Sequence, residues 1–233
     1  MQYLNDISIV IPEKDEDHTL LRDLKYKLEQ FGLEVIIVDD GSICQPSFAV
    51  KHLKNLGYGQ AIMTGIDNST RPIICTMDGD GQHTPEEVLK LCVAYKMIDC
   101  DMLIGARRLD YESAVRMIGR KCLNISASFF AWKWLSDLNS GLRIFKRNDV
   151  IGYYPILCKQ FSFTTSLTMS MLCDNHRVEW FPTKVCNRKL GKSHVNVIKD
   201  GLVTLYYIIR IGFALRTRKP RKLWRKIKEF CSR

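Results

Sequence analysis

The sequence lacks the marks of several protein classes. Its nine cysteines form no CxxC pair, so we expect neither a zinc site nor a disulfide framework, and their odd number fits a reduced chain. It has no Ser/Gly-rich linker and no internal repeat. The opening MQYLNDISIVIP runs into a strand pattern instead of the apolar segment of a secretory signal. These absences predict a cytoplasmic protein built around one domain.

Long apolar runs are also missing. The candidate at residues 202–215, LVTLYYIIRIGFAL, contains 14 residues with Arg210 among them. A helix that crosses a bilayer needs about 20 predominantly apolar residues. We therefore expect this segment not to span a membrane, and a helix packed on its own domain is one alternative.

The net charge of +10 is concentrated at the C-terminal end. Residues 216–233 contain nine Lys and Arg and one acid, a net charge of +8, which leaves +2 for the rest of the chain. Within this segment Leu223, Ile227 and Phe230 recur at helical spacing, with Lys and Arg on the other face. That pattern is typical of a helix lying in a membrane interface. It predicts that residues 199–233 form a basic amphipathic tail on an anionic membrane surface, which would make the protein peripheral on the cytosolic membrane face.

Apolar strand patterns alternate with amphipathic helix patterns in the first half of the chain. The strand patterns lie at Ile7–Ile11, Val35–Val38, Ile73–Met77 and Met102–Ile104, and the helix patterns include His18–Phe31 and Glu86–Met97. This alternation predicts an α/β fold with a mostly parallel sheet flanked by helices. Charged clusters follow the four strand patterns, namely PEKDED, DDGS, DGDGQH and GARR. Because ligands of such sheets bind beyond the carboxyl ends of the strands, we expect these clusters to face one site.

The stretch CTMDGDGQHTPEEV places two carboxylates, Asp78 and Asp80, close together at the end of a strand pattern. Carboxylates this close repel each other unless a cation lies between them. A calcium-binding EF-hand is excluded because Leu89 stands where its bidentate Glu is required. A plain structural turn and a divalent-ion site remain. The ion site would use Asp78, Asp80 and Gln82, together with phosphate oxygens, to bind Mg²⁺ or Mn²⁺. Thr84 then begins a helix as its N-cap.

The stretch GYGQAIMTG at residues 57–65 departs from the dinucleotide-binding spacing, because Ile62 stands in place of the third glycine. It predicts instead the start of a helix close to the ligand. Gly57 and Gly59 would allow a tight approach there.

Seven blocks occur in an order known from one family: SIVIPEKDE, VIIVDDGS, GYGQAIMTGI, MDGDGQHTPEEV, LIGARR, DLNSGLRIFKR and RKLGKSH. Over residues 7–195 the chain resembles family-2 glycosyltransferases, and most of all their dolichol- or polyprenol-phosphate mannosyl- and glucosyltransferase branch. The resemblance implies a Rossmann-like GT-A fold in residues 1–198 and inversion at the anomeric carbon. It also implies a nucleotide-diphosphate sugar donor, Mg²⁺ or Mn²⁺, and a polyprenyl or dolichyl phosphate acceptor.

The resemblance further implies roles for individual residues. Those implied to bind the nucleotide sugar are Pro12, Glu16, Asp39, Asp40, Asp78 and Arg107. Those implied to hold the metal are Asp78, Asp80 and Gln82, and those implied in catalysis are Asp80, Arg188 and Lys192. Those implied on the acceptor side are Asp137, Ser140 and Gly141. The metal and the two cations would stabilise the negative charge that grows on the leaving diphosphate.

Two departures from the family pattern bear on specificity. Lys14 and Asp15 stand where the family usually has Asn-Glu, which leaves the donor nucleotide unassigned. Thr165 and Ser166 stand where many relatives place a carboxylate. A hydroxyl acceptor needs a general base, whereas a lipid phosphate is already anionic, so the missing carboxylate favours a phosphate acceptor. Asp137 is an alternative base, with a structural role for it equally open.

Two other functions stay open. One is a glycosyltransferase that acts on a hydroxyl of a glycan or another soluble acceptor. The other is a non-catalytic module that binds a nucleotide sugar or, through Trp224 and Phe230 in the basic tail, a nucleic acid. Nucleic acid is the less favoured partner because the acidic loops suit a metal and phosphates.

Overall fold

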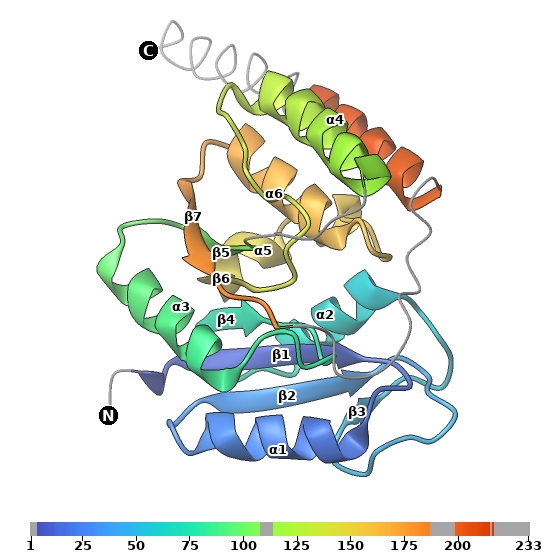
Figure 1. The fold of residues 1–233 in the computed structure, drawn as a ribbon, viewed down its shortest axis with the longest axis vertical. Coiled ribbons are helices and arrows are strands. Elements are labelled where there is room, and N and C mark those ends of the chain that lie inside the picture. The colour runs from blue at the N-terminus through green and yellow to red at the C-terminus, as the bar shows by residue number, and fades with distance from the viewer. Residues whose placement is uncertain (1–3, 108–113, 187–198, 215, 217–233) are drawn as a thin grey trace, which may run out of the picture.

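The computed structural model describes residues 4–107, 114–186, 199–214 and 216. Its centre is a seven-stranded sheet with the strand order β3-β2-β1-β4-β6-β5-β7 (Figure 1). The strands are β1 Ile7–Glu13, β2 Glu34–Asp39, β3 Val50–Lys51, β4 Ile73–Thr76, β5 Met102–Arg107, β6 Arg143–Lys146 and β7 Val178–Thr183. The helices are α1 His18–Glu29, α2 Tyr58–Asp67, α3 Pro85–Met97, α4 Ala114–Ala131, α5 Arg147–Ile151 and α6 Phe163–Cys173. Residues 199–214 form a further helix beside α4.

The sheet is mostly parallel, which confirms the predicted fold class. β1 pairs in parallel with β2 and β4, and β5 pairs in parallel with β7. β6 is the exception, since it runs antiparallel between β4 and β5. Thr76, the last residue of β4, lies opposite Arg143, the first of β6. The residues that precede β6 therefore lie at the carboxyl end of β4.

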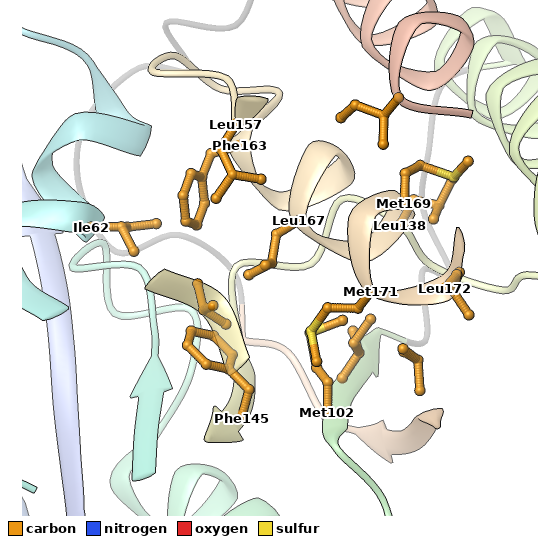
Figure 2. Packing of buried hydrophobic residues seen from close by; sticks show 14 of the residues in the cluster. Ile62, Met102, Leu138, Phe145, Leu157, Phe163, Leu167, Met169, Met171 and Leu172 are labelled. Atoms are coloured by element: carbon orange, nitrogen blue, oxygen red, sulfur yellow. The ribbon is translucent and has the colours of Figure 1, made fainter. Parts of the chain in front are cut away.

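Apolar residues cover both faces of the sheet. Alternate side chains of β1 point in opposite directions, so Val10 enters one core, with α2 and α6, while Ile9 and Ile11 enter the other, with α1 and α3. Figure 2 shows the first of these cores, where Phe145 and Met102 of the sheet face side chains of α6.

Side chains cap two helix starts, and the cap at Thr84 is the one predicted from the sequence. The side chain of Asp17 accepts a hydrogen bond from the Thr19 N–H at 2.8 Å before α1. Thr84 accepts one from the Glu87 N–H at 3.4 Å before α3, with Pro85 in the first turn. α3 thus begins directly after the acidic turn that follows β4.

The helix at residues 199–214 packs on the domain. Ile208 and Ile211 are buried in the same core as α6, and the hydroxyls of Ser162 and Thr204 lie 2.8 Å apart. None of the described helices is long and apolar enough to cross a membrane. The remainder of the predicted basic tail, residues 217–233, lies outside the described residues.

Candidate active site

The charged clusters meet at the carboxyl edge of the sheet. Glu13 and Asp39 are register partners at the ends of β1 and β2. The acidic turn follows β4, and Arg107 ends β5. The antiparallel β6 adds the loop that contains Asp137, Ser140 and Gly141, because that strand begins where β4 ends.

The acidic turn supplies oxygen ligands of the kind that Mg²⁺ and Mn²⁺ prefer. Asp80 is buried and accepts a hydrogen bond from the Gln82 N–H at 3.0 Å. Gly81 has a φ of +74°, in the left-handed region that glycine adopts without strain, and this reverses the chain between Asp80 and Gln82. Two carboxylates and an amide within one turn fit a divalent ion, although metal binding by these residues stays a prediction.

The carboxylate of Asp78 is held in one position. The Tyr58 hydroxyl donates to Oδ1 at 2.8 Å, and the Tyr58 ring is stacked on Phe161 with centroids 5.5 Å apart. Burial raises the pKa of Tyr58 well above its usual value, and the adjacent Asp78 carboxylate raises it further, so the phenol remains a hydrogen-bond donor. Gly141 also packs against the Asp78 carboxylate and leaves no room for a side chain there.

Replacing Gly141 by Ala is expected to lower turnover by about 10- to 100-fold, because small displacements of a reacting geometry cost rates of this order. The new Cβ would lie 2.5 Å from Oδ1 and 2.6 Å from Cγ of Asp78, so that carboxylate has to move. Gly152→Ala is the matched control, since nothing lies within 4 Å of its added Cβ. Steady-state kinetics of both variants check this, and equal turnover would contradict a precise role for Asp78.

Arg107 and Asp137 form a two-pronged ion pair. The Arg107 Nε lies 2.9 Å from Oδ2 and its Nη2 lies 3.1 Å from Oδ1, while the Asn139 N–H donates to the same carboxylate at 3.2 Å. Burial alone would raise the pKa of Asp137, but the Arg107 guanidinium more than offsets it, so that the pKa lies below its usual value. Of the two roles left open for Asp137, base and structural, these contacts favour the structural one.

Asp40 is bound by its own chain. Its carboxylate accepts hydrogen bonds from the N–H groups of Leu56 and Gly57, each at 2.8 Å, and contacts His52 Nδ1 at 2.8 Å. These bonds fix the start of α2, and the helix confirms the prediction that the stretch at residues 57–65 opens one. The predicted nucleotide contact of Asp40 remains untested.

Asp39 and Glu13 present unpartnered oxygen atoms at the same edge. The Ser42 N–H donates to Asp39 Oδ1 at 2.8 Å, whereas Asp39 Oδ2 and Glu13 Oε1 are buried without a hydrogen-bond partner in the described residues. Burial, followed by the charge of Asp39, raises the pKa of Glu13 from 4.5 to about 7. Two buried acceptors that lack donors suit the N–H and O–H groups of a nucleoside.

The raised pKa of Glu13 predicts a pH dependence of stability. Between pH 4.5 and about 7 the folded protein binds this proton more tightly than the unfolded chain, so the free energy of unfolding should fall as the pH rises. Glu13→Gln should remove this component and gain about 2–3 kcal/mol relative to wild type between pH 4.5 and 8. Urea unfolding at several pH values measures it. A constant difference between the two proteins would contradict the raised pKa.

The other two predicted nucleotide contacts lie on either side of Glu13. Pro12 is buried within β1, opposite Val38. The Glu16 N–H donates to Glu13 Oε2 at 3.4 Å. Glu16 also lines a surface hollow of about 410 Å³ together with Asp15, Asp17, His18, Ile43 and Cys44.

The loop before β6 rests on a buried cation. Arg143 is fully buried and donates to the carbonyl oxygens of Ser140, Leu138 and Thr164 and to the Thr168 hydroxyl, at 2.5–3.3 Å. Burial lowers the pKa of Arg143 to about 10, which leaves it charged at neutral pH. Arg143 thereby fixes the chain on either side of Ser140, and the Gly141 carbonyl accepts from the Thr76 hydroxyl at 2.7 Å.

His83 and the start of α6 complete the surroundings. His83 is buried beside Asp78 and Asp80, and its Nδ1 has no partner among the described residues. Burial lowers the pKa of His83, although the two carboxylates act in the opposite direction, so the ring is neutral at pH 7. Thr165 donates to Asn139 Oδ1 at 2.6 Å, and Ser166 donates to the Phe163 carbonyl at 2.8 Å. These hydroxyls are engaged within the chain.

Two further placements bear on the predicted site. Arg188 and Lys192 lie outside the described residues, so their catalytic roles stay predictions. Within the part of the chain that the structure describes, ligand atoms of Asp101, Asp149 and His176 lie within 4.8 Å of one another. Asp101 precedes β5, so this group lies at the amino edge of the sheet, opposite the predicted site. The Asp101 carboxylate already accepts a hydrogen bond from the Arg177 N–H at 2.8 Å.

Sequence reasoning missed Glu13, Tyr58, His83 and Arg143. All four fall inside quoted blocks, but only the fold shows that Glu13, His83 and Arg143 are buried and that Tyr58 is partly buried. Arg143 had no signal of its own, since an arginine at the start of a short strand normally faces solvent.

Comparisons with known proteins show likenesses in sequence. A family model described as Glycosyl transferase family 2 matches residues 8–163. An uncharacterized protein of Methanocaldococcus jannaschii is 32% identical over 226 residues, covering 88% of this chain and 91% of that protein. The undecaprenyl-phosphate 4-deoxy-4-formamido-L-arabinose transferase of Pectobacterium carotovorum is 28% identical, covering 70% of this chain and 58% of that protein. This chain thus spans somewhat over half the length of that transferase.

Solved structures share the fold at low identity. The glucosyl-3-phosphoglycerate synthase of Mycobacterium tuberculosis, in complex with Mn²⁺, uridine-diphosphate-glucose and phosphoglyceric acid, aligns with a TM-score of 0.67 at 13% identity. The alignment covers 90% of this chain and 79% of that chain. The same synthase with Mg²⁺ and uridine-diphosphate gives a TM-score of 0.62 at 14% identity. These likenesses show a GT-A fold.

Proposed function

Because this chain belongs to glycosyl transferase family 2 and is a glycosyltransferase, we propose that it moves a sugar from a nucleotide-diphosphate sugar to a polyprenyl phosphate, with inversion at the anomeric carbon. The observation that carries the proposal is the acidic turn at the carboxyl edge of β4, where Tyr58 and Gly141 hold Asp78 next to a buried Asp80. The named transferases that use undecaprenyl phosphate support the acceptor class.

Asp78, Asp80 and Gln82 would hold Mg²⁺ or Mn²⁺, which when bound supplies positive charge opposite the leaving diphosphate. Tyr58 orients the Asp78 carboxylate through its hydroxyl. Asp39 Oδ2 and Glu13 Oε1 would accept hydrogen bonds from the nucleoside. In the sequence, Arg188 and Lys192 follow β7 and would add cations near the diphosphate.

The reaction would need no general base from the protein. An anionic oxygen of the acceptor phosphate forms the bond to the anomeric carbon while the bond from that carbon to the donor diphosphate breaks, and a nucleoside diphosphate leaves. The Asp137 carboxylate is paired with Arg107, so it is not free to act as a base. Thr165 and Ser166, which stand where many relatives have a carboxylate, donate their hydroxyl hydrogen bonds within the chain. A hydroxyl acceptor is the second candidate and would require a base from elsewhere.

A panel of radiolabelled nucleotide sugars tests the proposal. The protein is mixed with membranes and either Mg²⁺ or Mn²⁺, and label entering organic solvent is measured. We expect one donor to give metal-dependent lipid labelling. Label transferred only to a soluble glycan would favour the hydroxyl acceptor, and no metal-dependent use of any donor would favour a non-catalytic binding module.

A further inference from the structure

Exposed apolar side chains gather on α4, the loop after it and the C-terminal helix. Its exposed side chains are Met117, Ile125, Phe129, Trp132, Trp134, Leu202, Tyr206, Ile209 and Phe213. We call these residues the aromatic patch. A soluble protein rarely exposes contiguous apolar surface of this kind unless the surface binds a partner.

The residues that the C-terminal helix contributes to the patch lie on a different face from those that pack in the core. Residues 202, 206, 209 and 213 recur at the spacing of one helix face, and all four are exposed. Ile208 and Ile211 lie on another face and are buried in the domain core. The helix therefore has two apolar faces, of which only one is used to pack on the domain.

The C-terminal helix lies beside α4 (Figure 1), and ring contacts join the two helices. The Phe129 and Phe213 rings, 73% and 60% exposed, each contact the Phe130 ring between them edge-on at 5.4 Å. Arg216 extends the surface, because its guanidinium lies 5.2 Å from the Trp132 ring and donates to the Phe130 carbonyl. Aromatic rings beside arginines are typical of surfaces that lie in a membrane interface.

We propose that this protein docks onto an anionic lipid bilayer through the aromatic patch. The choice of a bilayer as partner rests on the proposed transfer of a sugar to a lipid phosphate. Charge favours this occupant over a second copy of the chain. The nine Lys and Arg of residues 216–233 begin at the patch with Arg216, so pairing two patches would bring two strongly cationic segments together. Anionic headgroups would instead neutralise them.

The patch is also close to the site along the chain. Trp134, 78% exposed, precedes the Arg107 partner Asp137 by three residues, which can span at most about 11 Å. Docking through this loop would therefore bring headgroup phosphates of the bilayer near the carboxyl edge of the sheet. A soluble acceptor would not require this placement.

Flotation with vesicles tests the docking surface in the full-length chain. Phosphatidylcholine vesicles with and without phosphatidylserine are compared for wild type and for Phe129→Gln/Trp134→Gln. We expect wild type to bind the anionic vesicles and the double variant to bind at least tenfold more weakly. Leu53→Gln/Met97→Gln is the matched control, because these side chains are 102% and 81% exposed but lie outside the patch, and it should bind like wild type. Unfolding midpoints confirm that each variant is folded.

Equal vesicle binding by wild type and the patch variant would overturn the proposal. A wild type that is dimeric by light scattering, ignores vesicles and becomes monomeric in the patch variant would overturn it in favour of a second copy. Transfer to a short-chain polyprenyl phosphate in detergent separates the two proposals, and it should be unchanged in the patch variant. Patch-dependent vesicle binding without use of any nucleotide sugar would support the docking surface and reject the proposed reaction.

Discussion

Asp80→Asn is expected to lower turnover by about 100- to 1000-fold while the protein remains folded, since loss of metal charge stabilisation costs several kcal/mol in the transition state. Asp80 is buried and lies in the same turn as Asp78. A neutral amide is a weak ligand for Mg²⁺ or Mn²⁺, so the substitution removes charge with almost no change of shape. Turnover should be measured over a range of Mn²⁺ concentrations, and Mn²⁺ binding should be measured directly by calorimetry.

Asp99→Asn is the matched control for this substitution. Its side chain is fully exposed and pairs with Arg177 on the surface, so turnover and metal affinity should stay at wild-type values. The proposed metal site is wrong if Asp80→Asn turns over as fast as wild type, or if wild type keeps its activity in excess chelator.

Arg143→Met is expected to lower the free energy of unfolding by about 3 kcal/mol, a large share of the 5–15 kcal/mol typical of a domain. The substitution removes the donors that serve the buried carbonyls of Ser140, Leu138 and Thr164, and each buried acceptor left without a partner costs about 1–3 kcal/mol. Relief from burying the guanidinium, whose pKa falls to about 10, offsets part of that loss. Urea unfolding at pH 7 measures the difference.

Arg177→Met provides the comparison, because Arg177 makes surface contacts with Asp99 and Glu179. We expect it to change the free energy of unfolding by less than about 0.5–1 kcal/mol. If Arg143→Met is as stable as Arg177→Met, Arg143 does not support the loop before β6. If Arg143→Met is as stable as wild type but turns over slowly, Arg143 acts on catalysis and not on stability.

Four of the six parallel strands, β1, β2, β4 and β5, could be predicted because each is a short apolar run followed at once by charged residues, whereas β3 and β7 were not predicted. β1, β4 and β5 all fall on the predicted patterns, with ends that differ by up to three residues. The sequence blocks also identified the acidic turn, since two carboxylates beside a strand end are conspicuous without knowledge of packing.

β6 and its consequences could not be predicted from the pattern. RIFK is four residues long, and nothing local shows that it inserts antiparallel between β4 and β5. The contact between Gly141 and Asp78 depends on that insertion. The contacts of Asp40 were hidden for a similar reason, because its partners His52, Leu56 and Gly57 are brought to it only when α2 packs on the sheet.

The position of β6 also sets the order in which the sheet can assemble during synthesis. β1, β2, β3 and β4 are neighbours in the sheet and all lie before residue 77, so they can pair as soon as they leave the ribosome. β5 is made next, yet both of its neighbours, β6 and β7, come later in the chain. Until residues 143–146 arrive, β4 is an unpaired edge of the first piece and β5 has no neighbouring strand. The half that carries Asp39 and Asp78 can thus form early, while the Arg107–Asp137 pair must wait for the chain that joins the two pieces.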